Sequence, residues 1–330
     1  MDSVPRRHLA EPGGSQPDAQ DCAPWSIAIF ARDEAASLGG CFDALAVATA
    51  GARAEVSLVL NGTSDGSREI APDLMRAAGL QGQVWSIQQA DKSNAINQYV
   101  HRLRPAAEMH VFLDAYAAVA PDALRRLAAR LAAEPLARAV AAVPSSGRSA
   151  AALRADMLQN PGLHGSLFAL RESFVQRIAA AGLRLPVGLY RGDGLIGSYA
   201  MHDLDPVSSP WRPPHIAVAG DATWDLRPLR PWHPADLRRH LRRLVQQGRG
   251  RMESAAIRAT IYPGKLGPGG FDSLPESADR LILNWLAATP EAVPDPRRDP
   301  FAALALRQIR RRTPPPAAAL EPRLVATVRS

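Results

Sequence analysis

The chain has 330 residues, of which 46% are hydrophobic and 22% charged, and its formal net charge is +7. This length allows a full apolar core, and the two cysteines, Cys22 and Cys41, are too few for a disulfide framework or a zinc knuckle. No run approaches the roughly 18 apolar residues of a membrane span, and the start lacks a signal-peptide core, so we predict a cytoplasmic protein.

The positive charge is concentrated in the C-terminal third of the chain. Residues 230–258 hold eight Arg and two acidic residues, a local charge of +6, and residues 291–330 hold eight Arg and four acidic residues, a local charge of +4. Such a distribution favours an anionic partner, either phosphate, nucleic acid or an acidic lipid surface. The sequence shows no recognition helix, zinc motif or aromatic stacking platform, so we expect no nucleic-acid partner.

Short apolar runs alternate with helical stretches in the first half of the chain. Strands are predicted at residues 26–30, 55–60, 83–87 and 109–113, and helices at 35–49, from 67, at 93–103 and at 121–134. Repeated strand–turn–helix units predict an α/β fold with a mostly parallel sheet flanked by helices.

The second half continues with shorter strands and ends in helices. Strands are predicted at 140–143 and 167–170, a helix at 172–181, and two strands of an antiparallel extension at 216–219 and 222–226. An amphipathic helix is predicted over 234–257, with a break at Gly248 and Gly250, and a last long helix over 277–288.

Composition divides the chain into four parts. Residues 1–24 are polar and rich in Pro and Gly, which predicts a disordered lead-in. Residues 25–226 form the predicted α/β domain, and residues 227–288 a basic helical extension. Residues 289–330 are rich in Pro and Arg, and we expect a flexible tail with a short helix at 301–311.

Asp114 directly follows the buried apolar run of the fourth predicted strand. In an open parallel sheet, ligands bind outside the carboxyl ends of the strands, so a carboxylate at this position faces a binding crevice. The alternative is that Asp114 only ends the strand or caps a turn. A second carboxylate, Asp193, lies in the sequence Arg191-Gly-Asp-Gly, which predicts a turn.

Six motifs between Trp25 and Tyr199 together resemble the family 2 glycosyltransferases of the GT-A fold, which use a nucleotide sugar. They are Arg32-Asp-Glu-Ala35, Asn61-Gly-Thr-Ser-Asp-Gly66, Lys92-Ser-Asn-Ala-Ile-Asn97, Phe112-Leu-Asp114, His164-Gly-Ser-Leu-Phe-Ala-Leu-Arg171 and Gly192-Asp-Gly-Leu-Ile196. The resemblance implies a GT-A fold with a Rossmann-like sheet and inverting transfer of a sugar to an acceptor hydroxyl. The acceptor it implies is a glycan or a lipid-linked molecule in surface polysaccharide or glycolipid assembly.

This chemistry needs a site that neutralises charge on the departing diphosphate and removes a proton from the acceptor. The resemblance implies that Asp114 is the first acid of an Asp-x-Asp motif, which holds ribose and a divalent metal, and that Asp193 is the catalytic base. The other donor-binding residues that it implies are Arg32, Glu34, Asn61, Asp65, Lys92, Tyr116, Gly165 and Arg191.

Plainer roles remain open for several of these residues. Asp193 is also a common type of turn residue. Glu34 fits the N-terminus of one helix and Asp65 the cap of another, because the N-terminal end of a helix favours negative charge. Lys92 fits an exposed surface, and Gly165 fits an ordinary loop.

The acid that would complete the Asp-x-Asp motif is replaced by Tyr116. Two arrangements are then possible around the diphosphate. Either Asp114 binds Mg²⁺ or Mn²⁺ together with His202 or His215, or guanidinium groups bind the diphosphate directly. The candidate arginines are Arg191, Arg249 and Arg251.

A second departure is Leu60, where many members of the family have an Asp before the residue corresponding to Asn61. The sequence therefore does not determine which nucleobase the donor carries. Together, Tyr116 and Leu60 also motivate an alternative function, a non-catalytic GT-A-like scaffold or regulatory subunit of a glycan-assembly system.

The Arg-rich helix predicted over 234–251 ends in Gln246-Gln-Gly-Arg249-Gly-Arg251. This sequence partly resembles a Gln- and Arg-rich motif that many family members place near the acceptor. This position predicts an anionic acceptor, or peripheral attachment to an acidic membrane surface at its inner face. The alternative is a solvated helix whose Arg stems cover apolar surface.

Overall fold

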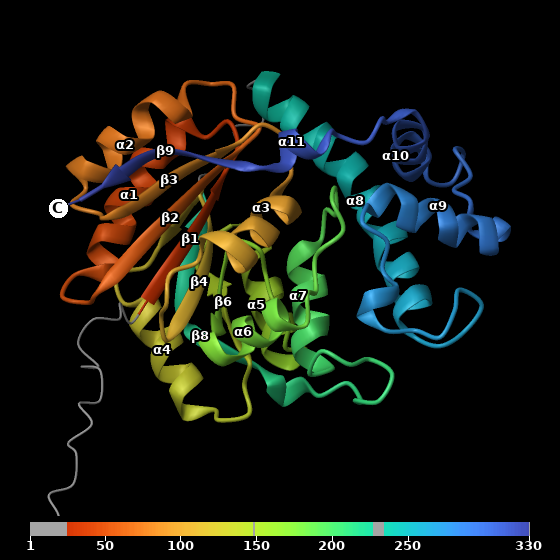
Figure 1. Ribbon diagram of the computed structural model, residues 1–330, viewed down its shortest axis with the longest axis horizontal. Helices are drawn as coiled ribbons and strands as arrows, with labels where there is room; N and C mark the ends of the chain where they lie inside the picture. The colour runs from red at the N-terminus through yellow and green to blue at the C-terminus, as the bar shows by residue number, and fades with distance from the viewer. Residues whose placement is uncertain (1–24, 148, 227–233, 330) are drawn as a thin grey trace, which may run out of the picture.

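The computed structural model describes residues 25–147, 149–226 and 234–329. Strands in these ranges are β1 (Trp25–Ala31), β2 (Ala54–Asn61), β3 (Gly82–Ile87), β4 (Met109–Asp114), β5 (Ala117–Val119), β6 (Ala139–Pro144), β7 (Leu167–Arg171), β8 (Ile216–Leu226) and β9 (Pro322–Val328). They form one sheet in the order β5-β8-β6-β7-β4-β1-β2-β3-β9, and Figure 1 shows β9, β3, β2, β1 and β4 side by side in it. The predicted α/β fold is confirmed.

Helices connect and cover these strands. They are α1 (Ala35–Thr49), α2 (Ser67–Ala77), α3 (Lys92–Gln98), α4 (Ala123–Ala133), α5 (Ala150–Gln159), α6 (Glu172–Ala180), α7 (Gly192–Met201), α8 (Pro234–Ile261), α9 (Ala278–Ala288), α10 (Pro300–Arg311) and α11 (Ala317–Leu320). A π-helical turn at Tyr99–Leu103 directly continues α3. Helices α1, α2 and α4 cover one face of the sheet, and α3, α6 and α7 cover the other.

The centre of the sheet is parallel, with β1 between β2 and β4. Alternate residues of β1 enter different cores: Ile27 and Ile29 pack towards α1, whereas Ala28 and Phe30 pack towards α3. Both faces of a central parallel strand are buried, which explains the continuous apolar run in the sequence. Because β1, β2, β3 and β4 run in one direction, their carboxyl ends lie at one edge of the sheet.

The prediction of two separate strands at 216–219 and 222–226 is wrong, because β8 is a single strand. It pairs parallel with β6 and antiparallel with β5. The register with β6 shifts where Ala142 faces Ala219 and Val143 faces Thr223. Residues 220 and 221, which separate the two predicted strands, are therefore an irregularity inside one strand, as expected of a β-bulge.

The prediction of a flexible tail over 289–330 is wrong for the described residues. Helix α10 forms there, as predicted for 301–311, and β9 adds an antiparallel strand to β3 at the edge of the sheet. Asn94 fixes the approach to β9 by donating from Nδ2 to Leu320 O at 2.8 Å. Pro and Arg dominate the composition of this segment, but its packing depends on Ala305, Leu306 and Ile309 of α10.

The predicted break at Gly248 and Gly250 is also wrong, because α8 is continuous through both. A Cβ on Gly248 would lie 2.7 Å from the backbone N of Ala302, and a Cβ on Gly250 would lie 2.9 Å from Arg191 Nε. The two glycines therefore allow other segments to approach the helix closely, which is a second use of glycine besides ending helices.

Some predictions concern residues without a described structure. The lead-in, residues 1–24, lies outside the described residues, and Cys22 lies there too. Cys41 is a free, buried thiol in α1, and burial, followed by the charges of Asp114 and Glu34, raises its pKa to about 12. Within the described ranges, none of the helices combines the length and apolar character needed to cross a membrane.

Two glycines inside helices should respond to substitution in opposite ways. Gly40 lies within α1, and a Cβ there would meet no atom within 4 Å. We expect Gly40→Ala to stabilise the protein by about 0.5–1 kcal/mol, because alanine loses less backbone entropy. Gly248→Ala should destabilise it by about 1–3 kcal/mol, because the backbone of α10 must move. Urea unfolding measures both, and a Gly248→Ala variant as stable as wild type would contradict the described α8–α10 contact.

Candidate active site

Asp114 is the last residue of β4 and lies at the carboxyl edge of the sheet, paired in register with Phe30 of β1. Its side chain is almost fully buried, and each carboxylate oxygen has its own donor. Lys92 Nζ binds Oδ1 as an ion pair, and the Tyr116 hydroxyl donates to Oδ2 at 2.5 Å. The Lys92 ammonium thus neutralises the carboxylate, and the Tyr116 phenol satisfies its second oxygen.

The peptide of Gly165 connects this pair to Asp193. Lys92 Nζ donates to Gly165 O at 3.1 Å, and Gly165 N donates to Asp193 Oδ2 at 2.8 Å. A Cβ on Gly165 would lie 3.2 Å from Lys92 Nζ and 3.3 Å from Asp193 Oδ2, so the absence of a side chain keeps both groups in place. Asp114 and Asp193, 79 residues apart in the sequence, therefore meet in one small region.

Asp193 lies in the first turn of α7, and the predicted turn at this motif is wrong in that respect. Its Oδ1 accepts from Gly194 N at 3.0 Å, while Oδ2 is bound to Gly165. Helix α7 begins at Gly192, where a Cβ would lie 3.0 Å from Ser93 Oγ. The helix can therefore start directly against α3 and deliver the carboxylate of Asp193 to the site.

His164 is a member of the site that the sequence identified only as part of a motif. Its ring stacks on Trp224 of β8, with centroids 5.0 Å apart and an angle of 24°. Burial lowers the pKa of His164; Asp193 and Asp114 oppose this shift, and Lys92 adds to it. At neutral pH the imidazole is therefore uncharged. Trp224 could not be found from the sequence, because only the course of β8 brings it here.

Tyr116 stands where a second acid would complete the Asp-x-Asp motif. The residue is 40% exposed, but its hydroxyl end is turned inward to Asp114. Burial, and then the charge of Asp114, hold the pKa of Tyr116 well above its usual value. The phenol therefore stays protonated and acts as a donor to Asp114.

The acids that follow β1 and β2 occupy different positions. Glu34 is buried, and it raises the pKa of the Tyr116 hydroxyl together with Asp114, so it lies close to the site. Asp65 instead joins two helix starts: it accepts from Ala35 N at 2.8 Å and from Ser67 Oγ at 2.5 Å. Burial raises the pKa of Asp65, but these hydrogen bonds outweigh the effect and lower it.

The other predicted donor-binding residues at this edge are arranged as follows. Asn61 donates from Nδ2 to Ala31 O at 3.0 Å and so holds the ends of β1 and β2 together. Arg32 is exposed and lies 3.9 Å from Asp33. Leu60 is buried in the core shared with α1, so its side chain contributes no polar group to the site.

The two histidines proposed as metal ligands are bound to other groups. His202 engages Ser209 O through Nδ1 and the Tyr262 hydroxyl through Nε2, each at 2.8 Å, and His215 engages Ala200 O through Nδ1 at 2.9 Å. The structure brings neither histidine together with Asp114. In the described part of the chain, no group of three or more His, Cys, Asp or Glu residues is arranged to hold a metal ion.

The residues at Asp114 do not fit a divalent cation as they are arranged. Mg²⁺ and Mn²⁺ favour several oxygen ligands around one ion. Here the carboxylate of Asp114 already binds an ammonium and a phenol, and that of Asp193 accepts from the backbone N of Gly165. A metal at Asp114 would have to displace Lys92, which carries charge of the same sign.

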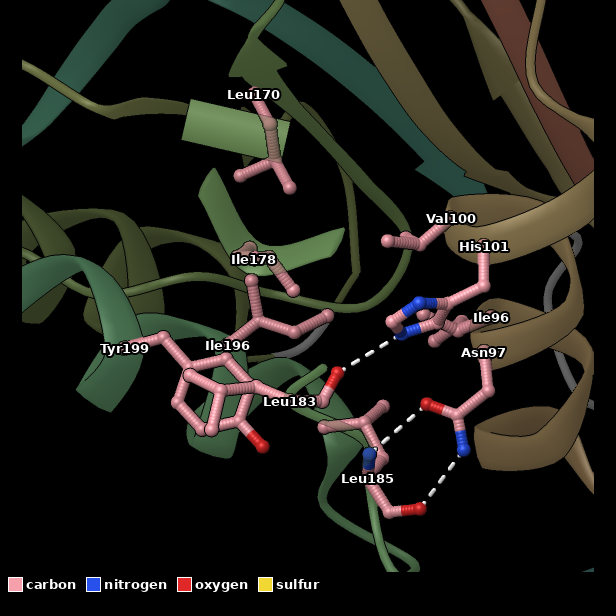
Figure 2. A pocket seen from close by; sticks show the side chains of 10 residues that line it. All are labelled: Ile96, Asn97, Val100, His101, Leu170, Ile178, Leu183, Leu185, Ile196 and Tyr199. Atoms are coloured by element: carbon pink, nitrogen blue, oxygen red, sulfur yellow. Dashed lines mark hydrogen bonds between the residues drawn. The ribbon is translucent and has the colours of Figure 1, made fainter. Parts of the chain in front are cut away.

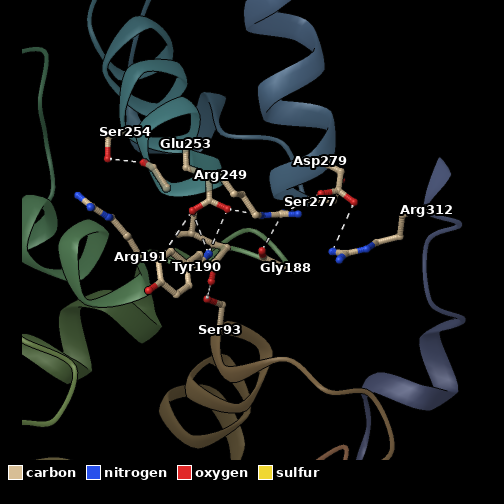
Figure 3. Close-up of polar contacts among 12 residues, drawn as sticks. Ser93, Gly188, Tyr190, Arg191, Arg249, Glu253, Ser254, Ser277, Asp279 and Arg312 are labelled. Atoms are coloured by element: carbon tan, nitrogen blue, oxygen red, sulfur yellow. Dashed lines mark hydrogen bonds and ion pairs between the residues drawn. The ribbon is translucent and has the colours of Figure 1, made fainter. Parts of the chain in front are cut away.

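Of the three candidate arginines, Arg249 is bound inside the protein (Figure 3). It is 7% exposed and pairs with Glu253 and Asp279, each at 2.7 Å. It also donates to Gly188 O at 2.8 Å. Arg251 forms an exposed pair with Asp299. Arg249 is therefore not free to bind a diphosphate, whereas Arg251 is held only by one exposed ion pair.

Glu253 and Arg249 of α8 hold the segment that leads into α7. The fully buried Glu253 carboxylate accepts from the backbone N of Tyr190 at 3.0 Å and of Arg191 at 3.4 Å. Together with the bond from Arg249 to Gly188, these contacts fix residues 188–191 immediately before Asp193. Helix α8 thus supports the position of the candidate base.

Helix α3 holds the same segment from the other side. Asp91, which caps α3, accepts from Gly188 N, and Ser93 Oγ donates to Leu189 O at 2.7 Å. Figure 2 shows Asn97 bound to both the N and the O of Leu185, at 2.8 Å each. The polar residues of the Lys92–Asn97 motif therefore position residues 185–191, a role that the sequence did not predict.

Figure 2 also shows a cavity between α3, α6 and α7. Its volume is about 10 Å³, and its walls are mainly apolar side chains such as Ile96, Ile178 and Ile196. A space of this size holds at most about one water molecule. It is a packing gap in the core and no substrate site.

The fold and the site together define a class of protein. A mixed sheet with a parallel centre carries a buried acid at the end of β4, and a second acid arrives from the later helix α7. This is the arrangement expected of a GT-A glycosyltransferase. Residues 26–175 match the model of a family described as "Glycosyl transferase family 2". The matched region is 150 of the 330 residues and contains five of the six motifs from which the resemblance was predicted.

Solved structures of glycosyltransferases share the fold. The mannosyltransferase PcManGT from Pyrobaculum calidifontis, in complex with GDP-Man and Mn²⁺, is 18% identical, with a TM-score of 0.54 over 89% of this chain and 83% of that chain. S. aureus TarS 1-349 is 14% identical, with a TM-score of 0.50 over 86% of this chain and 79% of that chain. At these identities the similarity establishes the fold. Among curated proteins, none matches the sequence.

Two arginines of α8 provide a matched test of the contact with residues 188–191. We expect Arg249→Ala to cost about 3–5 kcal/mol of stability, because it leaves buried carboxylates unpaired. Arg251→Ala, which removes an exposed ion pair from the same helix, should cost less than about 1 kcal/mol. Urea unfolding measures the stabilities. Amide hydrogen exchange at Tyr190 and Arg191 should accelerate only in Arg249→Ala, and equal exchange in both variants would contradict this role.

Proposed function

We propose that the chain transfers a sugar, with inversion, from a nucleotide-diphosphate sugar to the hydroxyl of a glycan or lipid-linked acceptor. The observation that carries this proposal is the meeting of Lys92, Asp114 and Asp193 around Gly165 at the carboxyl edge of the sheet. A relative in fold, PcManGT, was solved with the nucleotide sugar GDP-Man. Surface polysaccharide or glycolipid assembly is the role that we propose for the transfer.

The reaction has two requirements, and different residues of the site meet them. As the bond between the anomeric carbon and the diphosphate oxygen breaks, the leaving group gains negative charge, which the Lys92 ammonium stabilises. As the acceptor oxygen attacks the same carbon from the opposite face, Asp193 removes the hydroxyl proton. One displacement of this kind inverts the anomeric centre. The acid that ends β4, Asp114, holds the Lys92 ammonium in position.

Charge near Asp193 favours an acceptor that carries phosphate. Arg191 lies two residues before the base in sequence, and Arg243 of α8 contributes to the electrostatics of His164. Both side chains are exposed, and neither forms an ion pair with a described residue. A lipid-linked diphosphate would meet both cations, and we propose that the protein works at the inner face of a membrane as a peripheral protein. The side chains of residues 234–240 in the Arg-rich helix lie outside the described residues.

Binding of a nucleotide diphosphate is the first test. We expect UDP or GDP to bind with a Kd below about 1 mM, the range usual for enzyme substrates, because the acid and lysine at the edge of the sheet suit ribose and diphosphate. Titration calorimetry with each nucleotide, with and without Mn²⁺, measures the affinity. Asp73→Asn, a surface change on α2, should bind equally well. No binding of either nucleotide under either condition would contradict the proposal.

The role of Asp193 is tested by Asp193→Asn. We expect hydrolysis of the donor, or its transfer to an added acceptor, to fall by a factor of about 10² to 10⁴, since general-base catalysis contributes this much. Donor binding should persist, because the lysine and Asp114 remain. Turnover measured by release of nucleotide diphosphate, compared with Asp73→Asn, separates the effects. A fully active Asp193→Asn variant would refute the assignment, and wild-type protein that binds donor without any turnover would favour the scaffold alternative.

A further inference from the structure

Lys92 lies at the carboxylate where the family motif would place a metal ion. Its Nζ binds Asp114 Oδ1 and Gly165 O, and it lies 5.9 Å from the centre of the Phe30 ring. A carboxylate, a carbonyl and the face of an aromatic ring all attract a cation. The ammonium therefore sits in a site built for one positive charge, at the edge of the sheet where the diphosphate is expected.

We propose that Lys92 takes the place of the divalent cation, so that the protein binds its nucleotide diphosphate without a metal. The inference rests on the proposed function, because it concerns the donor of that reaction. Lys92 keeps one contact with Asp114 and turns further donors to the phosphate oxygens, which an ammonium with three N–H groups allows.

Tyr116 excludes the metal from the other side of Asp114. Its hydroxyl occupies Oδ2, the oxygen that Lys92 leaves free, and the phenol supplies no negative charge in exchange for the missing acid. A divalent ion would thus meet one carboxylate that already carries an ammonium and a donor hydrogen bond. Ligand number and charge both oppose binding, since Mg²⁺ and Mn²⁺ sites combine several oxygens.

The use of lysine at this position is unusual for the chain. Only Lys92 and Lys265 are lysines among 39 basic residues. A guanidinium is a broad planar fork, whereas an ammonium is a compact point charge. The space between Asp114 and Gly165 is small, because even a Cβ on Gly165 would lie 3.2 Å from Nζ. The compact ion fits this space and can replace a small metal ion.

The first experiment compares nucleotide binding with and without metal. We expect the Kd of wild-type protein for UDP or GDP in EDTA to lie within about twofold of the value in Mn²⁺. Lys92→Met should weaken binding in EDTA by about tenfold or more, as loss of a charge-assisted hydrogen bond does. Lys92→Arg keeps the charge but fits the small space less well, so it should recover only part of the affinity, and this recovery separates lost charge from misfolding. Binding by wild type only in the presence of Mn²⁺ would overturn the inference and leave the proposed function intact.

The second experiment asks whether the residue two positions after Asp114 decides metal binding. We expect Tyr116→Asp to bind Mn²⁺, seen as loss of the signal of free Mn²⁺ in electron paramagnetic resonance, and to bind nucleotide at least about tenfold better with Mn²⁺ than in EDTA. Tyr116→Phe removes the hydroxyl without adding charge and should not gain Mn²⁺. Mn²⁺ binding by wild-type protein would refute the inference. Absence of nucleotide binding with and without metal would refute the proposed function and this inference together.

Discussion

The position of the candidate base depends on a buried ion pair from a distant part of the chain. Arg249 and Glu253 lie on α8, yet they bind the backbone of residues 188–191 just before α7. Two charges buried in this way are costly unless every donor and acceptor is satisfied. Here the carboxylate also accepts from two backbone N–H groups, and the guanidinium also donates to a carbonyl and forms an ion pair with Asp279. The pair therefore fixes one geometry, and the first turn of α7 follows from it.

The buried pair of Arg249 and Glu253 also makes the C-terminal residues part of the structure that supports the candidate site. Helix α9 supplies Asp279 to the buried pair, and α10 packs on α8 at Gly248. The chain then returns to the sheet, where Leu320 meets α3 and β9 covers the edge of β3. Helix α3 begins at Lys92, so the C-terminal segment at Leu320 touches the helix that carries Lys92. A division into a catalytic domain and a tail does not describe this arrangement.

The fold was predictable from the sequence because each central strand is a continuous apolar run that ends at a polar turn. Asp114 and Asp193 were predictable as a pair only through the family motifs, since their approach depends on Gly165. The errors have local physical causes: Gly220 bends a strand without ending it, and Gly248 permits a close crossing of helices. The roles of His164 and Trp224 depend on a contact across the sheet, which no local pattern records.

Net charge, taken alone, misdirects the search for an anion site in this chain. The basic C-terminal third suggested several arginines, but Arg249 and Arg251 are neutralised by carboxylates and serve the packing of α8. The cation that reaches the candidate donor site comes from the net acidic part of the sequence, at Lys92. A charge acts on a ligand only when its own partners leave donors free and the backbone places it at the site. For this protein, the burial and pairing of each cation therefore carry more information than the total of +7.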